Sequence, residues 1–244
     1  GTYVCDILDF LTPSSLDYKY EHEINVNEIS ILPYYIANLN IEFTYRQLSG
    51  KYSSFNNICL VDTLDIIPEQ ITKNGKNIQQ DLFAVSLENI ERIKKQRDKK
   101  ISVIIGNPPY NANQVNENDN NKNRKYNRKK AGDFLGVDDR IKETYIKESQ
   151  KKKTKQYDMY KRFLRWATDR INQDGIVAFI TNRKYLEDAQ GDGFRKCVEQ
   201  EFSHIYVIDL GGDIRSNEDA NSNVFGIQTG VAIGYFVNRK KDRS

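Results

Sequence analysis

The sequence predicts an α/β protein with a doubly wound, Rossmann-like sheet that is mostly parallel and has an antiparallel last strand. Three observations support this fold class. Short apolar runs alternate with helical stretches along most of the 244 residues. Polar residues follow several of these runs directly, which is where such sheets bind ligands. The link between the last two runs, residues 211–228, has the composition of a loop rather than of a helical crossover, which indicates an antiparallel pair.

The first elements form a strand, a helix and a second strand. Residues 23–27 are a short strand-like run, and residues 31–48 follow as a helical stretch. Ser30 is placed to cap this helix, and Pro33 is tolerated in its first turn. Residues 57–61 form an apolar run of the buried-strand type.

The next predicted elements are a long helix over residues 80–99 and a strand over residues 101–105. The strand is an uninterrupted β-prone run, and the helix has a charged far face. The apolar residues of the helix recur at mostly helical spacing: Leu82, Phe83, Val85, Leu87, Ile90 and Ile93.

The remaining elements continue the alternation. Residues 157–172 and 193–202 are predicted helices, and residues 175–180 are an apolar strand between them. Residues 204–210 and 229–237 are the last two strands. Right-handed crossovers between parallel strands would place the functional residues after strand ends.

The composition fits one enzyme-sized domain in a cytoplasmic, soluble protein. Hydrophobic residues make up 38% of the chain and charged residues 29%. No apolar run approaches the roughly 18 residues of a membrane-spanning helix, and the first residues do not resemble a signal peptide. Cys5, Cys59 and Cys197 share no close spacing, and the chain has only two histidines. We therefore expect reduced thiols, no metal site and no membrane partner.

Positive charge is concentrated in one segment. Residues 122–155 contain thirteen Lys and Arg against five Asp and Glu, although the net charge of the whole chain is only +3. An Asn-rich tract precedes them, so residues 111–155 read as a polar, basic insertion. A solvated charge run is one interpretation, and binding of a polyanion is the other. The candidate phosphate contacts are Lys122, Arg124, Lys125, Arg128, Lys129, Lys130, Lys151, Lys152, Lys153 and Lys155.

A distinctive motif follows the strand at residues 101–105. Asn107, Pro108, Pro109 and Tyr110 lie where this fold places its chemistry. Two prolines stiffen the segment and leave its carbonyl groups available as acceptors, beside the amide oxygen of Asn107. A simple strand-terminating turn is the structural alternative.

Such a segment can hold a planar NH₂ group. An exocyclic amine is a poor nucleophile because its lone pair is delocalised into the ring. Two acceptors that bind both N–H bonds localise this pair and make nucleophilic attack possible. Tyr110 could stack on the ring and favour a nearby sulfonium cation. The implied chemistry is methyl transfer to an amine.

These residues resemble the N6-adenine DNA methyltransferases that carry Asn-Pro-Pro-Tyr after a sheet strand. The chain is most similar to the methyltransferase part of the type I single-polypeptide (type ISP) restriction-modification enzymes. Further matching segments, spread over nearly the whole chain, are Asn27–Ile29, Leu32–Ala37, Tyr157–Tyr160, Arg165–Ile171 and Asn223–Gly226. The resemblance implies methyl transfer from S-adenosylmethionine to a flipped-out adenine in double-stranded DNA, without a metal.

The resemblance also implies which residues bind the cofactor. Glu28 matches the acidic residue that binds the ribose hydroxyls of S-adenosylmethionine, and Asp62 matches the residue that accepts from its adenine amine. Gly1 and Thr2 match the end of the glycine-rich loop around the methionine part. Without the resemblance, Glu28 and Asp62 would be read as solvated loop carboxylates.

The same resemblance implies which residue stacks on the target base. Phe225 matches the aromatic residue that stacks on the flipped adenine opposite Tyr110, which together with Asn107, Pro108 and Pro109 forms the catalytic set. The alternative is that Phe225 is a core residue before the last strand.

The chain departs from the family at its start, because the first strand and most of the glycine-rich loop are absent. We therefore expect residues 1–244 to be a catalytic core cut from a longer polypeptide. Helicase and nuclease parts would lie upstream and a target-recognition domain downstream, and none of them is in this chain. Two other functions remain open: a protein glutamine N5-methyltransferase, and a non-catalytic DNA-binding remnant.

Overall fold

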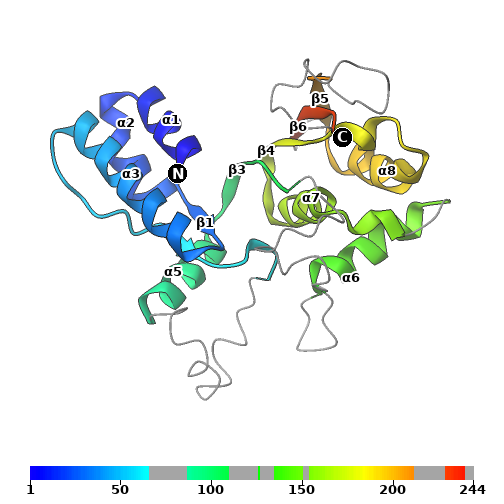
Figure 1. Ribbon diagram of the computed structural model, residues 1–244, viewed down its shortest axis with the longest axis horizontal. Helices are drawn as coiled ribbons and strands as arrows, with labels where there is room; N and C mark the ends of the chain where they lie inside the picture. The colour runs from blue at the N-terminus through cyan, green and yellow to red at the C-terminus, as the bar shows by residue number, and fades with distance from the viewer. Residues whose placement is uncertain (66–86, 110–125, 127–134, 151–153, 212–228, 240–244) are drawn as a thin grey trace. The chain divides into compact units, whose positions relative to one another are not determined.

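The computed structural model describes two compact units, Gly1–Lys99 and Lys100–Ser244 (Figure 1). Each unit has its own hydrophobic core. Both combine helices with parallel strands, so the predicted α/β class is confirmed. The described residues are 1–65, 87–109, 126, 135–150, 154–211 and 229–239.

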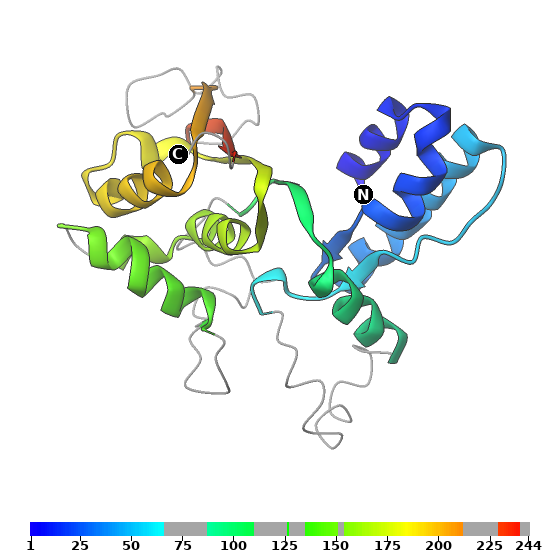
Figure 2. The ribbon, with the colours of Figure 1, turned by 180° about the vertical axis from the view of Figure 1, so that it is seen from behind.

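The first unit contains a small parallel sheet. Strand β1 contacts β2, α3 contacts both strands, and α5 contacts β2. In Figures 1 and 2, α5 lies below the two strands, while α1 and α2 lie above them. The elements are α1 (Thr2–Phe10), α2 (Pro13–Tyr18), a π-helical turn (Lys19–Glu23), β1 (Val26–Glu28), α3 (Ile31–Ser49), β2 (Ile58–Leu60), a 3₁₀ turn (Thr63–Asp65) and α5 (Leu87–Asp98).

The core of this unit is built around two stacked tyrosines. The rings of Tyr20 and Tyr45 lie 3.8 Å apart between centroids, and both are buried together with Ile58 of β2. The Tyr45 hydroxyl donates to the Asp17 carboxylate at 2.6 Å, so its polar end is satisfied. Helix α3 ends where Gly50 adopts a left-handed conformation (φ 73°), which glycine tolerates without steric cost.

The second unit contains a four-stranded sheet in the order β3-β4-β6-β5. Strands β3 and β4 are parallel, and β6 is antiparallel to both β4 and β5, as predicted for the last strand. The main elements are β3 (Ile101–Gly106), α6 (Val137–Ile141) with a π-helical turn (Lys142–Ile146), α7 (Met159–Arg170), β4 (Ile171–Asn182), α8 (Asp192–Glu201), β5 (His204–Asp209) and β6 (Val231–Asn238). Shorter 3₁₀ turns lie at Thr154–Tyr157, Arg183–Leu186 and Ala189–Gly191.

Alternate residues of these strands build the second core. Val177 and Phe179 of β4 and Phe236 of β6 are buried in one cluster with residues of α6, α7 and α8. These three helices lie on the same side of β4 in Figures 1 and 2. The alternate side chains Val103 and Ile105 of β3 are exposed, because a strand places successive side chains on opposite faces.

The structure differs from the predicted elements in several places. Residues 80–86 of the predicted helix 80–99 lie outside the described residues, and α5 covers Leu87–Asp98. Helices α1 and α2 precede the first strand and were not predicted. Strand β1 begins at Val26 because the chain is still helical over Lys19–Glu23, where the Ile24 amide donates to the Lys19 carbonyl. Strand β4 begins at Ile171, which pairs with Ile101 before the ladder shifts register.

Part of the expected insertion at residues 111–155 is helical and packed. Ile141, Tyr145 and Ile146 belong to the buried core of the second unit, and Val137 is also buried. A buried ion pair fixes this segment, since Arg162 of α7 donates to Asp138 of α6 at 2.7 and 2.9 Å.

Both partners of that pair are withdrawn from water. The side chains of Arg162 and Asp138 are 10% and 3% exposed. The Asp138 carboxylate also accepts from the Tyr126 amide at 2.9 Å, and the guanidinium group lies 5.2 Å from the centre of the Tyr126 ring. Removing one member would leave a buried charge without its counter-ion.

We therefore expect Arg162→Met to lower the free energy of opening around α7 by about 3–5 kcal/mol, measured by hydrogen exchange of the α7 amides. The double variant Arg162→Met/Asp138→Asn should recover most of this loss, since it removes the charge and keeps an acceptor for Tyr126. Arg140→Met is the matched control, because its pair with Asp169 is a third exposed on both sides and should contribute about 1 kcal/mol or less. An equal effect of Arg162→Met and Arg140→Met would contradict this account.

Candidate functional site

The predicted acceptor segment begins where β3 ends. Gly106 pairs with Phe179 of the parallel strand β4, and a Cβ atom on Gly106 would lie 3.3 Å from the Phe179 ring. Pro108 is buried and anchors the segment, whereas Asn107 and Pro109 are exposed. Among the described residues, the Asn107 side chain has no hydrogen-bond partner, so its amide oxygen can accept from a ligand.

The ends of the neighbouring strands lie at the same edge of this sheet. Asn182 ends β4, and its side-chain oxygen accepts from the Lys184 amide at 2.8 Å. Arg183 follows it and forms an ion pair with Asp209, the last residue of β5, at 2.6 Å. The Arg183 amide also donates to the Gly230 carbonyl just before β6. Arg183 and Asp209 were not predicted as site residues, although each lies at or just beyond the end of an apolar strand.

Backbone contacts also connect the two sides of the segment 212–228. The Leu210 amide donates to the Val231 carbonyl, and the Val231 amide donates to the Gly211 carbonyl. The Asp209 carboxylate additionally accepts from the Gly211 amide at 2.9 Å. The predicted stacking residues Phe225 and Tyr110 lie outside the described residues.

A buried tyrosine lies just beyond the end of β4. Tyr185 lies in the 3₁₀ turn after β4, and burial raises its pKa to about 12. It therefore stays protonated and neutral across the physiological range.

The predicted cofactor carboxylates are brought together in the first unit. Glu28 ends β1 opposite Leu60, and its carbonyl accepts from the Val61 amide at 2.8 Å. Asp62 follows β2 two residues later, so both carboxylates lie at the carboxyl edge of one parallel pair. Both residues are partly buried.

Local hydrogen bonds orient both carboxylates. The Glu28 carboxylate accepts from the Ile29 and Ser30 amides at 3.1 and 3.5 Å, just before α3. Ser30 is the N-cap residue of α3, as predicted, but its side chain makes no capping hydrogen bond. The Asp62 carboxylate accepts from the Leu64 amide at 3.0 Å. Carboxylate acceptors at this edge suit ligand hydroxyl and amine donors.

Gly1 and Thr2 lie at the start of α1. The Gly1 carbonyl accepts from the Val4 and Cys5 amides, so Gly1 caps the helix through its backbone. A Cβ atom on Gly1 would lie 3.0 Å from the Ala37 Cα atom of α3, so a larger residue there would require α3 to shift by a few tenths of an ångström. Thr2 is exposed.

The structure places few of the predicted phosphate contacts. Lys155 lies in the 3₁₀ turn Thr154–Tyr157, and the other nine basic residues lie outside the described part of the chain. Within the described ranges, no group of three or more His, Cys, Asp or Glu side chains could hold a metal ion. No described helix is both long and apolar enough to cross a membrane.

Three solved structures are similar to nearly the whole chain. A DrdV–DNA complex is 47% identical with a TM-score of 0.80, and covers 98% of this chain. A nuclease-deletion mutant of the type ISP restriction-modification enzyme LlaGI, in complex with a DNA substrate mimic, is 33% identical with a TM-score of 0.80 over 99% of the chain. The ATP-dependent type ISP enzyme LlaBIII bound to DNA is 33% identical with a TM-score of 0.76 over 98%.

The matched chain spans only 22%, 19% and 15% of these three proteins, respectively. Residues 30–214 match the family described as Eco57I restriction-modification methylase. This range includes Asp62 and the motif Asn107 to Tyr110, and it leaves out Gly1, Thr2, Glu28 and Phe225. The resemblance predicted from the motifs is thereby confirmed: the chain belongs to the Eco57I restriction-modification methylase family.

Proposed function

We propose that this chain transfers a methyl group from S-adenosylmethionine to N6 of an adenine in double-stranded DNA, as one part of a longer restriction-modification polypeptide. The observation that carries the proposal is the position of Asn107, Pro108 and Pro109 directly after β3, inside the range that matches the methylase family. DNA as the substrate is supported by the three similar proteins, which are described as DNA complexes. Membership of a DNA-modifying family argues against protein glutamine as the acceptor.

The exposed Asn107 amide and the proline carbonyls supply the acceptors for the reacting amine. When they bind both N–H bonds of the N6 amino group, the nitrogen lone pair localises and becomes nucleophilic. The buried Pro108 keeps the segment rigid, so little reorganisation is needed when the amine reacts.

The carboxylates after β1 and β2 fit S-adenosylmethionine by their donor and acceptor chemistry. The Glu28 carboxylate would accept from the two ribose hydroxyls, and Asp62 would accept from the adenine amine of the cofactor. Gly1 and Thr2 would contact the methionine part, where the Gly1 backbone approaches α3 closely. When bound, the cofactor supplies an electrophilic methyl group on a sulfonium.

Aromatic stacking would hold the adenine outside the duplex. Tyr110 follows the acceptor segment directly, and Phe225 lies in the segment whose two sides are joined by Asp209, Gly211 and Val231. Flipping is required because the amine is paired and unreachable inside a duplex.

The wider polypeptide would supply further parts. The similar proteins are about four to seven times as long as the matched chain, which supports motor, nuclease and target-recognition parts outside it. Strand β3 pairs on one side only among the described residues. A first strand from outside this chain would satisfy that open edge.

We expect Asn107→Ala in the full-length polypeptide to lower the methylation rate by about 10²–10³-fold, because one acceptor for the reacting amine is lost. S-adenosylmethionine affinity should stay nearly unchanged, measured by titration calorimetry beside a tritiated-methyl assay. Asn107→Asp, which keeps an acceptor oxygen, should retain more activity than Asn107→Ala. An Asn107→Ala variant that kept a tenth or more of the wild-type rate would exclude this role for Asn107.

Phe225→Ala should weaken the flipped state by roughly 1–3 kcal/mol, the contribution of one base–aromatic stack. The measurement is the fluorescence of 2-aminopurine at the target adenine, which rises when the base leaves the stack. Phe225→Trp keeps an aromatic face and should preserve the signal. If Phe225→Ala and wild type gave the same fluorescence, Phe225 would be a core residue instead.

Replacing Lys151, Lys152 and Lys153 by Ala should flatten the salt dependence of DNA binding. Each phosphate contact adds about 0.9 to the slope of log K against log salt, so three lost contacts should reduce it by up to about 2.7. The matched control replaces Lys94, Lys95 and Lys100, three lysines outside the basic segment. Equal slopes for both triple variants would mean that the basic segment is only solvated.

A further inference from the structure

Helix α3 has two apolar faces. Its inner face, with Ala37, Ile41 and Tyr45, is buried in the core of the first unit. Its opposite face carries five large apolar side chains that are 49–66% exposed. These five residues form what we call the outer stripe: Leu32, Tyr35, Ile36, Leu39 and Phe43.

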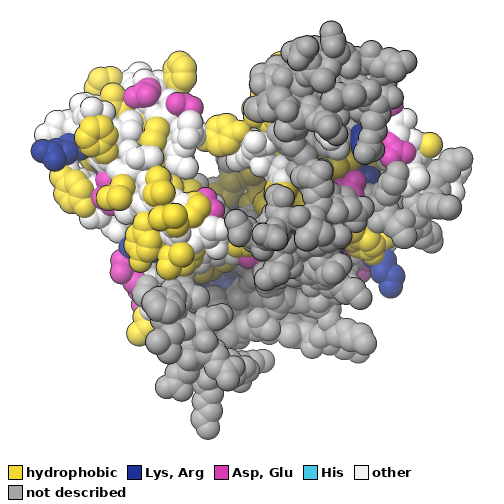
Figure 3. Space-filling view, in the orientation of Figure 1, with side chains coloured by type: hydrophobic (Ala, Val, Ile, Leu, Met, Phe, Trp, Pro, Cys, Tyr) yellow, Lys and Arg dark blue, Asp and Glu magenta, His cyan; other side chains and the backbone are white. Residues whose placement is uncertain are grey.

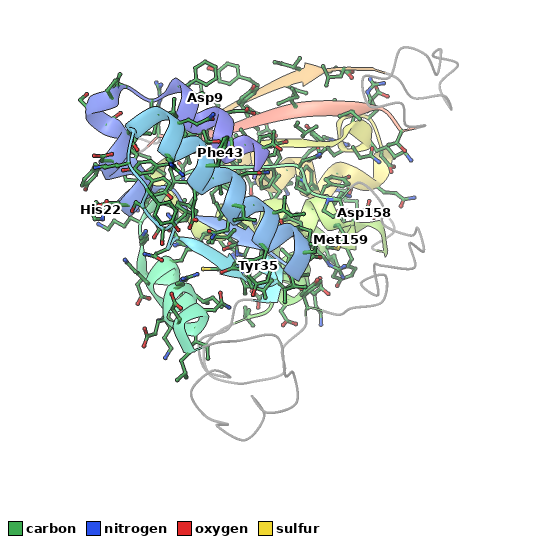
Figure 4. All side chains as sticks on the ribbon, turned by 60° about the vertical axis from the view of Figure 1, so that its left-hand side comes forward. Asp9, His22, Tyr35, Phe43, Asp158 and Met159 are labelled. Carbon is green, nitrogen blue, oxygen red and sulfur yellow. The ribbon has the colours of Figure 1, made fainter. Side chains whose placement is uncertain are left out.

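The outer stripe is continuous along the helix. Its members are spaced by three and four residues, so they lie on one side of α3 over about 16 Å. Figure 4 shows α3 at the front of the first unit, with Tyr35 and Phe43 labelled along it. Figure 3 shows hydrophobic side chains gathered over this helix. Single exposed apolar residues are ordinary, whereas a continuous row marks a surface that contacts a partner.

The apolar character and the spacing of the outer stripe limit the kinds of partner that can bind it. No stripe residue is charged, so the surface does not suit DNA phosphates or an acidic peptide. Side chains at a spacing of three and four form the ridges that pack into the grooves of another helix. An amphipathic helix of about three turns matches the 16 Å length.

We propose that the outer stripe of α3 docks an amphipathic helix from another part of the same polypeptide. This inference rests on the proposed function in one respect, namely that the chain is one part of a longer protein. The length of chain outside the matched region supports this occupant, since the match spans only 15–22% of the similar proteins. A partner on the same polypeptide is always present, so the apolar row would stay covered without assembly of copies.

Photocrosslinking in the full-length polypeptide tests the proposal. The photoreactive residue p-benzoylphenylalanine replaces Tyr35 in the stripe, and Tyr18 of α2 in a control variant. The two tyrosines are matched, because they are 58% and 59% exposed. The Tyr35 variant should give a several-fold higher yield of crosslinked peptide, and mass spectrometry should place the link in a helix outside these 244 residues.

Three outcomes would overturn the proposal: equal yields from the two variants, links that fall within the 244 residues, or links between differently tagged copies. The last would mean that the stripe pairs with a second copy of the chain. Methyl transfer and thermal unfolding are measured on the same samples. A normal crosslink without methylation would refute the proposed function and leave the docking surface standing, and normal methylation without the crosslink would do the reverse.

Discussion

The register of the parallel strand pairs determines which polar residues lie at the carboxyl edge of each sheet and which apolar side chains are buried. In the first unit, Glu28 lies opposite Leu60, so Glu28 and Asp62 emerge together at the carboxyl edge of β1 and β2. In the second unit, the pairing of Gly106 with Phe179 brings Asn107 to the edge where β4 also ends. A slip of one residue would turn each strand's side chains to the other face, exposing apolar residues and burying polar ones. Strand register therefore fixes both the cores and the proposed site residues.

Buried arginines of α7 impose a second constraint. Arg165 is 1% exposed and donates to Glu201 of α8 and to Asp169 of its own helix. Arg162 pairs with Asp138 of α6 on another side. Because a buried guanidinium group needs its carboxylate partner, these pairs specify how α6 and α8 pack on α7.

All six strands of the described residues were predicted, because each contains a β-prone apolar run, although the bounds of β1 and β4 differ. The polar residues that follow these runs indicated the site. Glu28, Asp62 and Asn107 lie at strand ends as expected. The packed helical segment around α6 was not predicted, because its many charged residues suggested an exposed insertion. Its apolar residues Val137, Ile141 and Tyr145 nevertheless recur every four residues, which is the spacing of a buried helix face. The pair of Arg183 with Asp209 joins residues 26 positions apart, and only the β4-β6-β5 pairing brings them together. The outer stripe of α3 was hidden because both faces of that helix are apolar.

The most direct test of the central claim is to sequence DNA treated with the full-length polypeptide and S-adenosylmethionine, using a method that detects modified bases on single molecules. The account predicts N6-methyladenine at one defined sequence, with other adenines unmodified. The methylated atom would be N6 because the proposed acceptors, the Asn107 amide and the proline carbonyls, would bind an exocyclic amine. Methyl groups on cytosine, or a methylated protein glutamine with unmodified DNA, would contradict it.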